Sequence, residues 1–382
     1  MQCDYFDAGV CRSCALLETP YARQLVDKDD AVRRALGVTA DGARWLPPVA
    51  SPEAGFRTKA KMVVGGTTAA PTLGILDAAG SGVDLQGCGL YPEELASAFA
   101  PVAAFVTRAA LEPYDLATRR GELKNVILTV SPDGELMVRF VMRSTEALAR
   151  LRKHLPWLRE QLPTLAVASL NVLPEHKAVV EGEREILLTE QESLPMRLDD
   201  LTLHLRPQSF FQTNTGVALE LYRQARGWID EASPVDVWDL YCGVGGFALQ
   251  ALAPGRDVLG VEVSEQAIAS ASLTRDELAA AGVPGAAEAR FLAADATSFA
   301  LAAQRAPELV VVNPPRRGIG PALAAWLDRS DARTVVYSSC HPGSLARDLA
   351  AMPRLRPVEI RVMDMFPHTT HAETAVLLTR GS

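Results

Sequence analysis

The sequence predicts an α/β fold in which a doubly wound parallel sheet follows a smaller α+β region. From about residue 201 onward, apolar runs of strand length alternate with stretches of helical spacing, as in "VDVWDLY" (235–241) before "GFALQALA" (246–253). Before that point, strand-like runs adjoin one another across turn signals instead. The 382 residues are enough for two or three domains.

The composition excludes several classes of protein. Hydrophobic residues make up 48% of the chain and charged residues 22%, as in ordinary globular proteins. No apolar run approaches the roughly 20 residues that cross a bilayer, and the first residues, "MQCDYFDAGVCRSC", carry no secretory signal. We therefore expect a cytoplasmic monomer without a membrane partner. A net charge of -8 does not indicate nucleic-acid binding, although such binding depends on local patches.

The elements of the first half are predicted in order from local patterns. Residues 1–55 are irregular apart from an amphipathic stretch at 21–36. "LKNVILTV" (123–130) and "ELMVRFVM" (135–142) flank the turn signal "SPDG" and predict a hairpin. The remaining predictions are a helix in "TEALARLRKHLPWLREQL" (145–162) and strands in "LAVASLNVL" (165–173) and "EILLTE" (185–190).

Three successive strand ends in the second half carry residues that suit an adenosine-type ligand. Glycines in "DLYCGVGGFAL" (239–249) let the chain turn sharply and approach a ligand closely. Glu262 and Asp295 end the next two predicted strands, and acidic groups there suit ribose hydroxyls. Because the dinucleotide fingerprint and the P-loop lysine are absent, we favour S-adenosylmethionine over NAD. Glu262 is also placed to interact with the dipole of a helix that begins at Ser264.

Cys340 follows another predicted strand, in "TVVYSSCHPGS" (334–344), at the same sheet edge. A cysteine usually packs as a small hydrophobe. A thiolate that adds to C6 of uracil would make C5 nucleophilic, which is covalent catalysis. A base must then remove the C5 proton, and Glu373 in "FPHTTHAETAVLL" (366–378) is a candidate, with a surface carboxylate as the alternative.

"NPPRRG" (313–318) ends a further predicted strand and leaves a second chemistry open. Asn-Pro-Pro also occurs in amino-group methyltransferases, where an aromatic residue that stacks on the base follows. Here Arg316 and Arg317 follow, and guanidinium groups suit phosphate or carbonyl recognition. Cys242, within the glycine-rich turn, is interpreted as a packing residue.

A basic surface is predicted from "FRTKAKMVVGG" (56–66), where Arg57, Lys59 and Lys61 alternate and would share one face of a strand. A solvated edge strand is the alternative. "RLRKHLPWLR" (150–159) adds further positive charge. The aromatic side chains that we expect to stack on a splayed base are Phe56, Phe210 and Phe211. Packing in a core is the alternative for Phe210 and Phe211.

Six motifs in order resemble those of the RNA uracil-C5 methyltransferases that carry an iron–sulfur cluster. They are "SFFQTN" (209–214), "DLYCGVGGFAL", "GVEVSEQAI" (260–268), "NPPRRGI" (313–319), "VVYSSCHPGSLARDL" (335–349) and "FPHTTHAETAVLL". The resemblance implies a class I methyltransferase sheet over 201–382, an RNA-binding domain over 56–200, Cys340 as nucleophile and Glu373 as proton acceptor. It also implies contacts to S-adenosylmethionine from Gln212, Tyr241, Glu262 and Asn313, and Gly243 and Asp295 complete the cofactor set that we expect.

"MQCDYFDAGVCRSC" (1–14) and "GCGLYP" (87–92) are similar to the cluster-binding segment of that family, which implies a segment over 1–55 and 78–95. A [4Fe-4S] cluster would then be bound by Cys3, Cys11, Cys14 and Cys88. The spacing alone suits zinc equally well. A structural disulfide is not expected in the reducing cytosol.

Two kinds of feature indicate the branch of the family: the cluster cysteines that precede the six motifs, and individual residues within those motifs. The cluster cysteines begin at residue 3, without the β-barrel domain of some members, and transfer-RNA enzymes lack these cysteines. Both features resemble the branch that methylates 23S ribosomal RNA, as does Asn313 where relatives have Asp. His341 stands where we expected Asn. The alternatives are a tRNA uracil-C5 methyltransferase, an amino-group methyltransferase of the Asn-Pro-Pro type, and a non-catalytic cluster-bearing RNA-binding protein.

Overall fold

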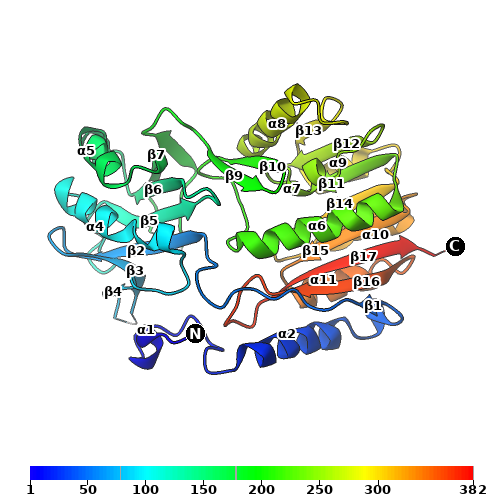
Figure 1. The fold of residues 1–382 in the computed structure, drawn as a ribbon, viewed down its shortest axis with the longest axis horizontal. Helices are drawn as coiled ribbons and strands as arrows, with labels where there is room; N and C mark the ends of the chain where they lie inside the picture. Colours follow the sequence, from blue (N-terminus) through cyan, green and yellow to red (C-terminus); the bar gives the residue numbers. More distant parts are fainter. Residues whose placement is uncertain (78, 177–178, 382) are drawn as a thin grey trace. The chain divides into compact units, whose positions relative to one another are not determined.

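The computed structural model describes residues 1–77, 79–176 and 179–381, and its chain divides into two compact units (Figure 1). The first unit comprises Met1–Ser13, Glu53–Arg197 and Arg206–Gln208, and the second comprises Cys14–Pro52, Leu198–Leu205 and Ser209–Ser382. Residue 78, the first of the predicted segment 78–95, lies outside the described residues, as do residues 177–178 of the predicted domain 56–200 and residue 382.

The first unit is built on a seven-stranded sheet in the order β4-β3-β2-β5-β6-β7-β8. Its strands are antiparallel neighbours except for β6 and β7, which are parallel and are joined by helix α5 (Leu148–Gln161). Apolar side chains of α4 (Phe99–Arg108) and α5 pack with the sheet in one core. The strands are β2 (Lys59–Gly66), β3 (Pro71–Leu76), β4 (Gly82–Asp84), β5 (Leu123–Val130), β6 (Leu136–Met142), β7 (Leu165–Val172) and β8 (Arg184–Leu187), and the short helices are α1 (Asp4–Asp7) and α3 (Glu93–Ala96).

The predicted hairpin and the predicted helix of the first unit are confirmed. β5 and β6 pair in antiparallel register across the "SPDG" turn, and Gly134 takes a φ of 82° that favours glycine. The basic strand is only partly as predicted. β2 begins at Lys59, so Lys59 and Lys61 alternate with the buried Ala60 and Met62, whereas Arg57 lies before the strand.

The second unit contains an eight-stranded sheet in the order β1-β16-β17-β15-β14-β11-β12-β13. Its pairs are parallel except where β17 is inserted antiparallel between β15 and β16. All four residues of β14 are buried, which requires cover on both faces of the sheet. This sheet confirms the predicted α/β class. The strands are β1 (Arg44–Trp45), β11 (Asp236–Leu240), β12 (Asp257–Glu262), β13 (Arg290–Ala293), β14 (Leu309–Val312), β15 (Thr334–Ser339), β16 (Leu355–Met363) and β17 (Glu373–Arg380).

The helices of the second unit begin with α2 (Tyr21–Leu36), whose bounds match the predicted amphipathic stretch. Val32 and Leu36 of α2 are buried in the same core as the central strands. The others are η1 (Gly37–Ala40), α6 (Thr215–Ala232), α7 (Gly246–Gln250), α8 (Glu265–Ala280), α9 (Ala296–Ala302), α10 (Gly320–Arg329) and α11 (Pro342–Ala350). A separate two-stranded sheet consists of β9 (Leu194–Leu198) and β10 (Leu201–Leu205). Among the described residues we find no helix with the length and apolar character of a membrane span.

Candidate active site

The candidate site lies at one edge of the eight-stranded sheet, where β11, β12, β14 and β15 end and β17 begins. Ser339 of β15 pairs with Thr374 of β17 in antiparallel register. Cys340 and Glu373 directly flank this last pair, and the charge of Glu373 acts on the Cys340 thiol. The sheet therefore brings the two predicted catalytic residues together, although 33 positions separate their numbers.

Cys340 is half-buried directly after β15. Burial raises the pKa of its thiol, the charge of Glu373 raises it further, and the positive charge of Arg316 lowers it. Arg316 itself is exposed. These interactions put a thiol, a carboxyl group and a guanidinium within electrostatic range of one another, and only the guanidinium favours the nucleophilic thiolate.

Glu373 is the first residue of β17 and is 1% exposed. Its Oε1 accepts a hydrogen bond from the Ser338 hydroxyl over 2.5 Å. Burial raises the pKa of this carboxyl group to about 7, against the lowering effect of that hydrogen bond. A carboxyl group with a pKa near neutrality can take up and release a proton under physiological conditions, as a general base must. The alternative of a surface carboxylate is wrong.

His341, where the sequence led us to expect Asn, caps helix α11. Its Nδ1 accepts the backbone N–H of Ser344 over 3.0 Å, and Pro342 occupies the first helical position. Asparagine is one of the preferred residues for this capping role. The imidazole thus performs the task that a side-chain amide would perform, and the chain leaves β15 in a defined direction.

The glycine-rich turn after β11 is shaped by left-handed backbone and by close packing. Tyr241 has a φ of 71° and Gly245 a φ of 88°. A Cβ on Gly246 would lie 2.6 Å from the Tyr222 hydroxyl oxygen. One oxygen of the Glu262 carboxylate accepts the N–H of Gly243 in this turn. The other accepts the N–H of Ser264, the residue directly before α8. Each carboxylate oxygen retains a further lone pair for a ligand hydroxyl.

The other predicted cofactor residues differ in how their side chains are used. The Asp295 carboxylate caps α9 by accepting the N–H of Ser298, so part of its hydrogen-bonding capacity is structural. Tyr241 places its hydroxyl 3.4 Å from Thr297 Oγ1. Asn313 is half-buried directly after β14, and Gln212 is buried shortly before α6.

The comparisons with known proteins identify the family. A family model described as tRNA (Uracil-5-)-methyltransferase matches residues 175–381, and a curated relative from Halothiobacillus neapolitanus is 50% identical over 100% of both chains. The chain belongs to the tRNA (uracil-5-)-methyltransferase family. The Halothiobacillus relative is named 23S rRNA (uracil(747)-C(5))-methyltransferase, as is an Escherichia coli relative that is 46% identical over 100% of both chains.

A solved structure of the same class supports the fold of this uracil-5-methyltransferase. It is a Pyrococcus abyssi tRNA (uracil-54, C5)-methyltransferase in complex with S-adenosyl-L-homocysteine. The similarity covers 96% of this chain and 85% of that chain, with a TM-score of 0.77 and 26% sequence identity. The expected class I methyltransferase sheet is thereby confirmed.

The predicted RNA contacts of this uracil-5-methyltransferase lie in both units. Arg316 and Arg317 are exposed in the second unit. In the first unit, burial and the charges of Arg139 and Lys61 lower the pKa of Lys59 to about 8. The aromatic candidates separate: Phe210 is 70% exposed, whereas Phe211 is 4% and Phe56 is 7% exposed. Stacking on a base is therefore retained for Phe210, and the prediction for Phe211 is wrong because its ring packs in the core.

The four predicted cluster cysteines of this uracil-5-methyltransferase are divided between the units. Cys3, Cys11 and Cys88 belong to the first unit and Cys14 to the second. Burial raises the pKa of Cys88, and the charges of Cys3 and Cys11 raise it further. Within the described ranges, no group of three or more His, Cys, Asp or Glu side chains is arranged to hold a metal ion. Cys242 is buried, in agreement with its interpretation as a packing residue.

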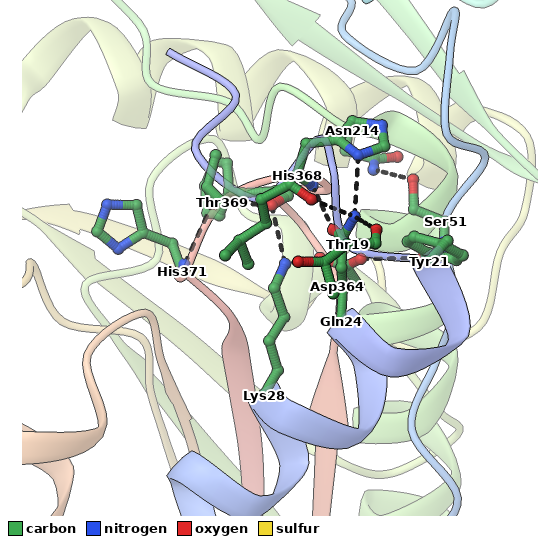
Figure 2. A network of polar contacts seen from close by, with 12 residues as sticks. Thr19, Tyr21, Gln24, Lys28, Ser51, Asn214, Asp364, His368, Thr369 and His371 are labelled. Carbon is green, nitrogen blue, oxygen red and sulfur yellow. Dashed lines mark hydrogen bonds and ion pairs between the residues drawn. The ribbon is translucent and has the colours of Figure 1, made fainter. Parts of the chain in front are cut away.

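A buried polar network near Glu373 was not predicted (Figure 2). It joins α2 to the turn between β16 and β17, where Lys28 donates to the Asp364 carboxylate and Gln24 bonds to His368. Tyr21 also donates to Asp364, over 2.9 Å. The partners are more than 330 positions apart in the sequence, so no local pattern connects them. The only local feature of the sequence that marks this turn is the unusual "FPHTTH" run (366–371).

Proposed function

We propose that this chain transfers a methyl group from S-adenosylmethionine to C5 of a uracil in 23S ribosomal RNA. The observation that carries the proposal is the pairing of Ser339 with Thr374, which leaves Cys340 and the buried carboxyl group of Glu373 at the same end of the β15–β17 ladder and within electrostatic range of each other. A nucleophile and a proton acceptor side by side are what this reaction requires. The full-length relatives named as 23S rRNA uracil-C5 methyltransferases support ribosomal RNA as the substrate.

The reaction follows from the chemistry of the two side chains. The Cys340 thiolate adds to C6 of uracil, forms an S–C6 bond and moves electron density to C5. S-adenosylmethionine would supply an electrophilic methyl group on a sulfonium centre; as C5 bonds to that methyl group, the S–CH3 bond would break and its electron pair would stay on the sulfur of the departing S-adenosylhomocysteine. The Glu373 carboxylate then removes the proton from C5. The electron pair of that C–H bond re-forms the C5–C6 double bond, and the S–C6 bond breaks to release Cys340.

Arg316 assists the first step in this proposal, because its charge opposes the effects that raise the pKa of Cys340. Arg316 and Arg317 are exposed and suited to RNA phosphates, since guanidinium groups form paired hydrogen bonds with phosphate oxygens. Phe210 would stack on a base that has left its helix. Further phosphate contacts are proposed for Arg57, Lys59 and Lys61.

The cofactor site fits S-adenosylmethionine by its donor and acceptor groups. The Glu262 oxygens would accept ribose hydroxyls. The remaining side chains proposed to contact the cofactor are Gln212, Tyr241, Asp295 and Asn313, together with the backbone of Gly243.

We also propose that Cys3, Cys11, Cys14 and Cys88 hold a [4Fe-4S] cluster. Four thiolates are a donor set that suits iron–sulfur clusters. The charges of Cys3 and Cys11 raise the pKa of Cys88, which supports a shared site for these three, and a bound cation would offset that effect. The cluster would be structural, held by segments 1–55 and 78–95, beside an RNA-binding domain over 56–200 and a catalytic domain over 201–382. The proposed enzyme is a cytoplasmic monomer.

The decisive experiment compares Cys340→Ala with the unaltered enzyme on a 23S rRNA fragment and on a tRNA transcript. We expect methyl transfer and the covalent enzyme–RNA adduct to fall to background, while binding of S-adenosylmethionine persists. Cys340→Ser is the matched variant, since its hydroxyl is a far weaker nucleophile and should also form no adduct. A fully active Cys340→Ala would point to amino-group methylation instead. Preference for the tRNA transcript would contradict the ribosomal substrate.

A further inference from the structure

We propose that Gln24 is a positioning residue that ties the segment after Cys14 to the turn that precedes Glu373. The proposal rests on the proposed function, in which Glu373 removes the C5 proton. All the residues that carry it lie in the second unit. Figure 2 shows how Gln24 and Lys28 of α2 point toward the turn that contains Asp364 and His368.

Gln24 connects three pieces of chain through one buried amide that is 1% exposed. Its Nε2 donates to the carbonyl oxygens of Leu16 over 3.0 Å and Thr19 over 2.8 Å, and lies 3.3 Å from His368 Nδ1. Its Oε1 accepts the backbone N–H of His368 over 2.9 Å. A side-chain amide offers two donors and one carbonyl acceptor, so both ends of Gln24 are used.

A backbone hydrogen bond also joins the segment after Cys14 directly to the turn at His368, without the Gln24 side chain. The N–H of Leu16 donates to the carbonyl oxygen of His368 over 2.9 Å, and the N–H of Leu17 donates to the carbonyl oxygen of Cys14. The segment that follows Cys14 and the turn at His368 therefore form one hydrogen-bonded unit. His368 has a φ of 63°, which costs a residue with a side chain and needs such fixed surroundings.

Lys28 anchors the start of the same turn. Its ammonium group donates to the carbonyl oxygen of Phe366 over 2.9 Å and pairs with the Asp364 carboxylate. β16 ends at Met363 and β17 begins at Glu373, so strand pairing does not fix the residues between them. The contacts to α2, together with the Leu16–His368 backbone bond and the bond from the Asp364 N–H to the Val49 carbonyl oxygen, hold the path by which the chain reaches Glu373.

The consequence concerns one step of the reaction. Formation of the adduct needs Cys340, which directly follows β15 and is not reached through the turn. Removal of the C5 proton needs Glu373 in place, and a displacement of about 1 Å can cost about 100-fold in rate. Loss of the Gln24 hydrogen bonds should therefore slow release of methylated RNA and leave adduct formation unchanged.

The test follows formation and decay of the covalent adduct with a 23S rRNA fragment for the full-length protein. Gln24→Met keeps the side-chain volume and removes all its hydrogen bonds, and we expect adduct decay to slow by about tenfold or more. Gln24→Glu keeps an oxygen for the His368 N–H and should decay at an intermediate rate. The control is Arg23→Met on the same helix, where the side chain is 66% exposed and pairs with Asp27.

Glu373→Gln separates this proposal from the proposed function. If the unaltered enzyme forms no adduct, or Glu373→Gln does not accumulate it, the catalytic roles are wrong. If Glu373→Gln accumulates adduct while Gln24→Met decays at the normal rate, Gln24 is not a positioning residue. Equal decreases in the rates of adduct formation and adduct decay in both Gln24 variants would also overturn the positioning role of Gln24, because they would indicate general destabilisation of the protein. Should Gln24→Met not fold, the decay rate of Gln24→Glu decides by the same criteria.

Discussion

The hydroxyl group of Ser338 lies 2.5 Å from Glu373 Oε1, to which it donates a hydrogen bond. Ser338 pairs with Ala375 in the β15–β17 ladder, two residues beyond Glu373 on the same face of the sheet. The bond stabilises the charged form of a carboxyl group that burial would otherwise keep protonated. Ser338 thus limits how far the pKa of Glu373 rises.

Replacement of this serine should shift the pH dependence of product release. Ser338→Ala removes a hydrogen bond to a charged group, which contributes about 1.5–3 kcal/mol, or about one to two pKa units. The pKa of Glu373 should rise further above about 7. Because the base acts when deprotonated, the rate of adduct decay should reach its plateau at a higher pH. The measurement is adduct decay as a function of pH.

The control for this prediction is Ser330→Ala, because the Ser330 hydroxyl bonds only to the carbonyl oxygen of Leu327 and the N–H of Ala332 among the described contacts. Its pH profile should match that of the unaltered enzyme. An unchanged midpoint in Ser338→Ala would mean that the serine does not tune the base.

The buried carboxyl group should also make stability depend on pH. The pKa of Glu373 is about 7 in the folded chain and ordinarily 4.5, so between these values the folded chain binds more protons than the unfolded chain. The free energy of unfolding should fall as pH rises through this window, by about 3 kcal/mol. Glu373→Gln should remove that contribution. Asp239, whose pKa burial also raises to about 7, adds a fall of the same sign.

Urea unfolding of the unaltered protein and of Glu373→Gln between about pH 5 and pH 8 measures the effect. The variant should gain stability relative to the unaltered protein as pH rises. Glu288→Gln, at an exposed carboxyl group, should show no such gain. A constant difference across the range would contradict the raised pKa.

The buried ion pair between Lys28 and Asp364 gives a prediction about stability. Their side chains are 2% and 0% exposed, and removal of one partner of such a pair costs about 3–5 kcal/mol. Lys28→Met should therefore lower the free energy of unfolding by that amount. The double variant Lys28→Met/Asp364→Asn should recover part of the lost free energy of unfolding, since no uncompensated charge remains buried.

Arg23→Ala is the surface comparison, because the exposed pair of Arg23 and Asp27 on the same helix should contribute less than about 1 kcal/mol. Chemical denaturation compares the four proteins. Equal losses from Lys28→Met and Arg23→Ala would show that the pair is not buried in solution.

The proposed cluster predicts a specific metal content. Protein purified without oxygen should contain iron and acid-labile sulfide and absorb visible light. Cys88→Ser should lose most of both, while Cys242→Ser, at a buried thiol that packs beside Gly260, should retain them. Zinc without sulfide would contradict the iron–sulfur assignment and restore the alternative that cysteine spacing leaves open.

The parts of the molecule that follow from the sequence are those that depend on local pattern. The spacing of apolar residues over 21–36 and the "SPDG" turn predict α2 and the β5–β6 hairpin with correct positions. Strand ends with functional side chains predict the sheet edge that carries Cys340. The expected basic strand failed only at Arg57, because β2 begins at Lys59.

Features that depend on long-range pairing could not be predicted. The contact between Lys28 and Asp364 joins elements 336 positions apart. The burial of Phe211 beside the exposed Phe210 depends on how the chain enters α6, which composition does not reveal.

β17 comes last among the strands yet lies inside the sheet, between β15 and β16. It carries Glu373, the proposed proton acceptor, whereas Cys340, the proposed nucleophile, follows β15, two strands earlier in the chain. The sheet therefore cannot be completed before β17 has been synthesised. A polypeptide without β17 would expose the edges of β15 and β16. Under the proposed mechanism it would also lack Glu373, the base needed to release RNA bound covalently to Cys340.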